Sequence, residues 1–511
     1  MPSGDARFGA GVAALRREAL YVSQLILLKA VRVPLWLLVS AMLTHVFDPS
    51  GLGTWSMILS AAAFLNQLLL HWTQSITQRF GRGEWSATRR LDAAWALRWP
   101  SLVLGLGVIV CSLALLPFDW TQRFYGLDHS HRWYVLPVAI TLWIVAEVQS
   151  TQQVSQRFSA LAWAPIVADS GLLLCIGLLT YVAPFGRKPG FDTVIAPIVG
   201  TSLIIWCCWL ARELSITRIA WHLPELDRWR QAARFAIPLV PGFLVGYLSE
   251  WCDYFLIQRF YGSQGVGLFH PAFQYMLILI GLPTAVVSVL LPRFTTDFDK
   301  NGRIEVEKLI GRTAPQLFVL WGLLSLVAAA TLPSLLLLLL GKQFDPTSGL
   351  LQVLLIAVPG AMSQHICYVA CFVQRRLWTA TVGLFGLKLL VNVAVSLILL
   401  PRIGVVGSAL GTGLSYIALQ WAFLIDQRRH LEAPKSSSVV VALLLVQSGG
   451  VALALTPGLW LRLALCGVWC AGLIAWARRD RIFPAETVTA VIPRRLAGLT
   501  GPALRLLCRG E

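Results

Sequence analysis

The stretch TAPQLFVLWGLLSLVAAATLPSLLLLLL, residues 313–340, contains no charged side chain and is bounded by Arg312 and Lys342. A helix needs about 20 mainly apolar residues to cross the hydrocarbon core of a bilayer, so this stretch predicts a transmembrane helix. Hydrophobic residues make up 57% of the 511 residues and charged residues only 13%. About fourteen stretches of this kind predict an all-α polytopic membrane protein, with spans at about 18–45, 50–73, 95–117, 134–156, 160–183, 193–213, 235–258, 264–292, 313–340, 348–374, 377–400, 406–427, 438–456 and 459–477.

A weak internal similarity predicts how the spans are grouped. Gly200-Thr201-Ser202-Leu203 opens the sixth span much as Gly411-Thr412-Gly413-Leu414 opens the twelfth, and repeated halves are common among transporters. We therefore expect one six-helix lobe at 1–213, a second six-helix lobe at 214–430 and two extra transmembrane helices at 431–477. Residues 478–511 form a basic tail, which is predicted to lie on the cytoplasmic leaflet.

The distribution of Lys and Arg predicts the orientation of the chain. With the N-terminus inside, 31 of the 42 Lys and Arg residues fall in cytoplasmic segments, 8 fall in outer loops and 3 lie within spans. Cytoplasmic loops are enriched in these residues, so both termini are predicted to be cytoplasmic. The net charge of +17 follows from the same asymmetry and does not indicate a nucleic-acid partner.

The sequence lacks the signatures of enzymes and of cofactor sites. It contains no GxxxxGKS/T, HExxH or GxSxG motif, which would indicate nucleotide binding, a zinc protease or a serine hydrolase. The longest predicted outer loop, at about 118–133, is too short for the external catalytic loop of glycan polymerases and ligases. The ten cysteines are dispersed, and no histidine or carboxylate completes a metal-ligand set. We expect no enzyme activity, no cofactor and no metal.

Several charged residues lie inside predicted spans, where a charge is costly unless it faces water or a partner. Lys29 and Arg32 are three positions apart in the first span and therefore share a helix face. Lys388 lies in the eleventh span, Asp169 in the fifth and Glu147 in the fourth. We predict that the three cations bind substrate and that Glu147 or Asp169 is an ion-coupling or proton-coupling site. Structural ion pairs between these opposite charges are the alternative.

Two acidic residues lie near the outer end of the seventh span. Glu250 and Asp253 are three positions apart and share a helix face. Their position in the second half matches that of Lys29 and Arg32 in the first half. We predict a gate between the lobes at this point, with solvation of Asp253 at the membrane rim as the alternative.

Polar side chains form stripes on the inner halves of three spans. The second span carries Gln67 and His71, the fourth carries Gln149, Gln152 and Gln153, and the tenth carries Gln364. Amides offer hydrogen-bond donors and acceptors, which suits sugar hydroxyls. The stripes therefore predict a wet, substrate-binding vestibule. Hydrogen bonds between helices, which are common in membranes, are the alternative.

Three motifs, in this order and spacing, resemble one transporter branch. The first runs from Asp253-Tyr-Phe-Leu-Ile-Gln-Arg-Phe-Tyr-Gly262 through Gly265-Val-Gly267 to Pro292. The second is Gly341-Lys-Gln-Phe, and the third runs from Asn392 to Pro401-Arg-Ile-Gly404-Val-Val-Gly407-Ser-Ala. Together they resemble the polysaccharide-flippase (O-antigen) branch of the multidrug/oligosaccharidyl-lipid/polysaccharide exporter superfamily.

The resemblance implies two six-helix lobes around a central cavity, with alternating access. It implies a flippase in the bacterial inner membrane that moves an undecaprenyl-pyrophosphate-linked oligosaccharide from the cytoplasmic to the periplasmic leaflet for polysaccharide biosynthesis. Lys29 and Arg32 match the cationic first-span positions that such flippases offer to the pyrophosphate. The expected partners are this lipid-linked oligosaccharide, membrane lipids, and a polysaccharide polymerase with its chain-length regulator, and the expected oligomeric state is a monomer.

Three alternatives to this function stay open at this point. A cation-coupled multidrug antiporter of the same superfamily would have twelve spans and a cavity led by acidic groups. A membrane glycosyltransferase or polymerase would carry a long acidic or His-bearing outer loop. A cell-wall lipid II flippase is a close sibling that the sequence does not exclude.

Overall fold

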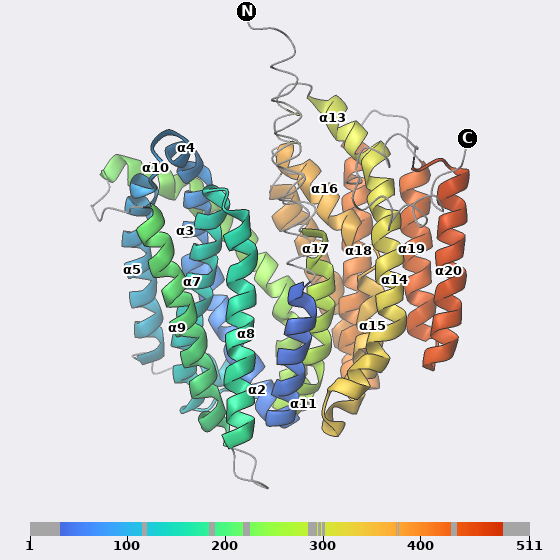
Figure 1. Ribbon diagram of the computed structural model, residues 1–511, viewed down its shortest axis with the longest axis horizontal. Helices are drawn as coiled ribbons and strands as arrows, with labels where there is room; N and C mark the ends of the chain where they lie inside the picture. Colours follow the sequence, from blue (N-terminus) through green and yellow to red (C-terminus); the bar gives the residue numbers. More distant parts are fainter. Residues whose placement is uncertain are drawn as a thin grey trace, which may run out of the picture. The chain divides into compact units, whose positions relative to one another are not determined.

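Every regular element that the computed structural model describes is a helix (Figure 1). The described residues are 31–114, 120–182, 190–217, 225–284, 302–374, 378–430 and 437–483, with isolated positions beside them. Within this part of the chain, nine helices are long and apolar enough to cross a membrane, or up to eleven if each of two bent pairs is one span. Each predicted span has a helix in its described part. The all-α polytopic class is confirmed, while the count of fourteen spans stays a prediction.

The chain forms two compact units, of which the first comprises Met1–Pro271 and Leu339–Phe344. Its helices are one at Val31–Val46, α2 (Pro49–Leu65), α3 (His71–Ile76), α4 (Arg82–Thr88), α5 (Asp92–Ala114), α6 (Trp120–Tyr125), α7 (Val135–Val154), α8 (Phe158–Val182), α9 (Phe191–Thr217), α10 (Leu226–Ala236) and α11 (Val240–Gly281) as far as Pro271. Single π-helical turns at Asn66–Leu70 and Thr77–Gly81 join α2, α3 and α4. Short 3-10 turns at His131–Tyr134 and Ile237–Leu239 precede α7 and α11.

The second unit comprises Ala272–Leu338 and Asp345–Glu511. Its helices are α13 (Arg303–Lys308), α14 (Ala314–Leu339) as far as Leu338, α15 (Asp345–Leu354), α16 (Ala361–Val373), α17 (Phe385–Ile403), α18 (Val405–His430), α19 (Ser437–Leu455) and α20 (Leu459–Arg479). Turns of π-helix at Leu309–Thr313 and Thr379–Leu384 precede α14 and α17. The lobes expected at 1–213 and 214–430, and the separate roles expected for 431–477 and 478–511, stay predictions.

Two glycines of the quoted motifs separate consecutive spans. Gly262 has φ +63° inside α11, and Gly404 has φ +71° between α17 and α18. Side chains with a Cβ rarely adopt this left-handed region, so glycine allows the chain to turn there. After the turn, Gly411 of α18 lies so close to Ser396 and Asn392 of α17 that a Cβ atom would overlap them. The third motif therefore encodes a tightly packed α17–α18 hairpin.

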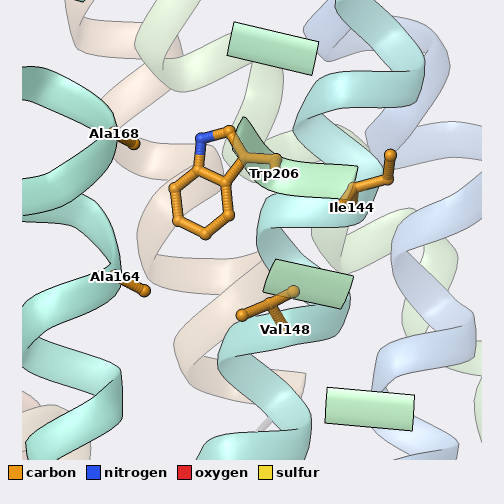
Figure 2. Close-up of a cluster of buried hydrophobic side chains, with 5 residues drawn as sticks. All are labelled: Ile144, Val148, Ala164, Ala168 and Trp206. Carbon is orange, nitrogen blue, oxygen red and sulfur yellow. The ribbon is translucent and has the colours of Figure 1, made fainter. Parts of the chain in front are cut away.

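A hydrophobic core in the first unit joins three of its long helices (Figure 2). Ile144 and Val148 of α7 and Ala164 and Ala168 of α8 surround the indole of Trp206 from α9. All five side chains are buried. Small alanines on α8 leave room for the large indole, which lets the three helices pack closely. This packing fixes the positions of the charged residues on α7, α8 and α9.

A second core in the other unit holds the last two helices. Val319 of α14, Val446 of α19 and Leu473 and Ala477 of α20 form one buried cluster. At the opposite end of the pair, the buried Arg462 of α20 donates to Ser334 Oγ at 2.7 Å. The helices α19 and α20, which lie side by side in Figure 1, are therefore integral to the second unit.

Candidate functional site

The first helix and α8 are joined by an ion pair between two of the predicted site residues. Arg32 Nε lies 2.6 Å from Asp169 Oδ2, although the residues are 137 positions apart. The Arg32 side chain is 43% exposed and that of Asp169 only 9%. These two residues therefore form an ion pair in this structure, as in the alternative interpretation of the charged residues inside the spans. Their predicted roles toward substrate and proton stay predictions, and Lys29 lies outside the described residues.

Glu147 is enclosed within the first unit together with a cation that the sequence did not single out. Arg98 of α5 forms an ion pair with Glu147 and also donates to Thr77, and both side chains of the ion pair are fully buried. Trp143 Nε1 donates to the other Glu147 oxygen at 3.0 Å. The count of Lys and Arg placed Arg98 among the cytoplasmic loop cations, although the predicted span 95–117 includes it, because the apolar run follows it. Since α5 begins at Asp92, Arg98 lies about 9 Å inside the helix.

A second internal ion pair explains part of the glutamine stripe on α7. Glu213 of α9 is buried and lies 2.5 Å from Arg157 Nη1, and Gln152 Nε2 donates to the same carboxylate at 2.9 Å. Gln152 therefore joins helices, as in the alternative interpretation of the stripes. Gln153 points elsewhere: it is exposed and accepts from Gln78 Nε2 at 3.3 Å. Gln149 is half-buried.

The remaining polar stripe residues are distributed over both units. Gln67 and His71 are half-buried in the first unit, where the His71 ring lies edge-on to Phe243 at 4.6 Å between centroids. Gln364 is buried in the second unit. Its neighbour His365 has Nε2 2.9 Å from the Ile280 carbonyl oxygen. Their predicted contact with sugar hydroxyls stays a prediction.

We expect a thiol introduced at Gln153 to react with a membrane-impermeant reagent from the cytoplasmic side. A thiol at Gln152, one position earlier, should stay protected, because that side chain is buried against Glu213. The measurement is mass-tag labelling of Gln153→Cys and Gln152→Cys in a cysteine-free background. Equal protection of both would contradict a wet vestibule at this depth.

Lys388 is enclosed by the α17–α18 hairpin. It has no exposed surface, and its Nζ lies 3.7 Å from the centroid of the Tyr416 ring. Cation–π contacts of this kind stabilise a desolvated ammonium group. Asn392, one turn further along α17, is also fully buried and accepts from Ser396 Oγ at 3.1 Å. The placement of Lys388 argues against direct contact with a substrate in this conformation.

The two acidic residues of the predicted gate differ in burial. Glu250 is half-buried, whereas Asp253 is fully buried beside Tyr254 and Cys252. Solvation of Asp253 at the membrane rim is therefore wrong for this structure. At this height α11 packs against α6, where the centroid of the Phe255 ring lies 5.1 Å from that of the Tyr125 ring. An apolar sequence around Asp253 does not show whether a helix face meets lipid or another helix. The gate itself stays a prediction.

Close contacts between α2 and α11 form what we name the outer seam: Ser50, Gly53 and Ser60 with Tyr247, Ser263 and Gly267. Ser50 Oγ and Ser263 Oγ are 3.5 Å apart, and Ser60 Oγ and Tyr247 Oη are 3.0 Å apart. Gly53 and Gly267 face each other so closely that a Cβ atom on either would overlap the other helix. The orientation predicted from the Lys and Arg distribution places this end of the helices outside, and it stays a prediction.

The second motif is also part of the first unit, close to the start of α2. Gln343 Nε2 donates to the Phe47 carbonyl oxygen at 2.9 Å. His45 Nε2 lies 3.0 Å from the Leu339 carbonyl oxygen. These bonds hold the segment Leu339–Phe344 against the end of the first helix, which explains why it belongs to the first unit although it follows α14.

Residues 130–477 match the sequence model of a family described as lipid II flippase MurJ. The chain belongs to the MurJ lipid II flippase family. It is therefore a multi-pass membrane transporter of lipid-linked oligosaccharide and not an enzyme. The lipid II flippases were one of the alternatives that the sequence analysis left open. The polysaccharide-flippase branch, which the three motifs resemble, is not specifically supported by this match. No curated protein matches the chain.

Solved structures of the same superfamily share the fold. A lipid II flippase MurJ in an inward closed conformation matches with a TM-score of 0.64 and 14% identity, covering 91% of this chain and 100% of that one. An inward-facing MATE multidrug transporter matches with a TM-score of 0.55 and 12% identity, over 83% and 96% of the two chains. The Vibrio cholerae MATE transporter VcmN in the bent form gives 0.53 and 14%, over 84% and 98%. At these identities the likeness concerns the fold.

Proposed function

We propose that this MurJ family member moves an undecaprenyl-diphosphate-linked peptidoglycan precursor, the lipid II class, from the cytoplasmic to the outer leaflet. The observation that carries the proposal is the family match over residues 130–477, which includes most of the second compact unit and about half of the first. An O-antigen or exopolysaccharide precursor is the competing substrate. It shares the lipid diphosphate and differs in the glycan.

The chemistry of a lipid diphosphate supports a role for the first helix. A diphosphate carries at least two negative charges, and removing it from water is costly without fixed cations. The Arg32 side chain is nearly half exposed, and its guanidinium offers a planar set of donors that matches phosphate oxygens. Lys29, three positions earlier, would share its helix face. We therefore assign the diphosphate to this end of the first helix.

The outer seam supports an alternating-access cycle. The seam brings backbone against backbone at Gly53 and Gly267, and a lipid-linked glycan cannot pass between helices in such contact. Transport by this route requires α2 and the second half of α11 to separate and close again. We propose that both termini are cytoplasmic and that the protein lies in the inner membrane, as the 31 to 8 distribution of Lys and Arg supports.

The test is replacement of the resident lipid II flippase in a bacterium in which that protein is depleted. We expect this chain to restore growth and to restore the accessibility of lipid II to an enzyme that cleaves it only at the outer face. A matched arm uses a strain that lacks its O-antigen flippase. Rescue of the second strain without rescue of the first would overturn the peptidoglycan-precursor assignment and favour the polysaccharide one.

A further inference from the structure

The ion pair between Arg32 and Asp169 is asymmetric in its exposure. Asp169 is buried on α8, whereas nearly half of the Arg32 side chain is exposed. Arg32 donates to Asp169 through Nε, so toward the described part of the chain the two terminal nitrogens of the guanidinium keep their donors for another anion. An anion that approaches Arg32 competes with a carboxylate already bound to it.

The other charged side chains on the helices that pack against α8 are engaged elsewhere. On α7, Glu147 is paired with Arg98, and on α9, Glu213 is paired with Arg157. The remaining charged groups of α9 are Asp192, which accepts from Tyr134 Oη, and Arg212, which lies over the Trp209 ring. Among the described residues, Arg32 is thus the cation within ion-pair distance of Asp169.

We propose that Asp169 holds Arg32 in the empty transporter and takes up one proton when a lipid diphosphate binds Arg32, which couples substrate binding to proton binding. The inference rests on the proposed function, because it concerns the regulation of the same site. The exchange balances: the Arg32–Asp169 contact breaks, a guanidinium–phosphate contact forms, and a proton from the bulk solution joins an Asp169 carboxylate oxygen.

The physical reason for proton uptake is the burial of Asp169. Once the guanidinium turns to the diphosphate, an ionised Asp169 would be a buried carboxylate without a cation, and such groups neutralise instead. An ionised Asp169 would also repel the diphosphate, since both are negative. Protonation removes this repulsion and leaves the full charge of Arg32 to the diphosphate. The diphosphate-bound state therefore holds more protons than the empty state, so affinity must rise as pH falls.

The experiment measures binding of farnesyl diphosphate, a short-chain lipid diphosphate, to the purified full-length protein over a series of pH values. We expect the wild-type affinity to rise as pH falls, by up to about tenfold per pH unit where Asp169 is ionised in the empty state. Asp169→Asn should bind more tightly than wild type at high pH and lose most of this dependence. Arg32→Gln should bind weakly at every pH. The titration of farnesyl diphosphate itself is common to all variants.

Glu213→Gln is the matched control, because Glu213 is likewise a buried carboxylate paired with an arginine, and it lies outside the site. It should keep the wild-type pH dependence. A second measurement needs only the wild type: a pH-indicator dye should report uptake of about one proton per bound diphosphate in a weakly buffered solution.

The outcomes separate this inference from the proposed function. If Arg32→Gln weakens binding while Asp169→Asn keeps the wild-type pH dependence, or if no proton is taken up by the wild type, proton exchange at Asp169 is wrong and the diphosphate site stands. If Arg32→Gln binds as tightly as wild type, the diphosphate assignment in the proposed function is itself wrong.

Discussion

Replacement of Glu147 by leucine is expected to destabilise the protein by about 3–5 kcal/mol, because it leaves the guanidinium of Arg98 buried without a counter-charge. Both side chains are fully buried, and the pair joins α5 to α7 in the first unit. Loss of one partner of a buried pair is far more damaging than loss of both. Arg98→Leu should therefore have an effect of similar size, and the double variant Arg98→Leu/Glu147→Leu should recover most of the loss.

The measurement is unfolding of the purified protein in one detergent, together with its accumulation in the membrane. The control is Asp227→Asn, which removes a carboxylate 3.7 Å from Arg230 on an exposed face of α10 and should change stability by no more than about 0.5 kcal/mol. A double variant that is less stable than either single variant would mean that the two charges do not stabilise each other, and the pair would not be the structural element described above.

Features that depend on local sequence were predictable. The charge-free stretch 313–340 forms α14 from Ala314 to Leu339, since a continuous apolar run determines a span without reference to the rest of the fold. The motif glycines Gly262 and Gly404 end helices because a positive φ is a property of one residue. The order of the three motifs indicated the superfamily, and only the match over residues 130–477 selected the lipid II flippases within it.

Features that depend on a partner far along the chain were not predictable. Arg98 appeared to be a loop cation because it stands at the polar edge of an apolar run, and its carboxylate partner is 49 positions away at Glu147. Gln152 and Gln153 are neighbours with the same chemistry, yet one is buried on Glu213 and the other is exposed. Helical spacing places side chains on a face, but it does not say which face meets another helix.

The Arg32–Asp169 pair shows how far sequence analysis reaches at the candidate site itself. The sequence identified both residues, because an ionisable side chain within a span is a candidate for function. It assigned the cation to substrate and the anion to coupling as separate roles. In the structure the two side chains are in contact, 2.6 Å apart. A substrate that binds Arg32 therefore competes with the Asp169 carboxylate, and the proposed proton coupling follows from this competition.

A covalent link across the outer seam is expected to abolish transport. Ser50 Oγ and Ser263 Oγ lie 3.5 Å apart at the ends of two short side chains, and a disulfide bond is about 2.05 Å long, so cysteines at these positions can form one with a small local adjustment. In a cysteine-free background, oxidised Ser50→Cys/Ser263→Cys should lose lipid-linked glycan export. Since α2 and α11 must separate in the proposed cycle, the link should stop each molecule in the closed-seam conformation.

Reduction of the same sample provides the decisive comparison, because it restores the freedom of the two helices without any change of sequence. We expect the reductant to return export to the level of the single variants Ser50→Cys and Ser263→Cys, neither of which can form the link. Glycines at positions 53 and 267 hold the helices in backbone contact, so cross-linking should be efficient in the resting protein. If the oxidised double variant is fully cross-linked and still exports at the rate of the single variants, the seam does not open during transport. The lipid-linked glycan would then have to leave by a route that does not separate α2 from α11.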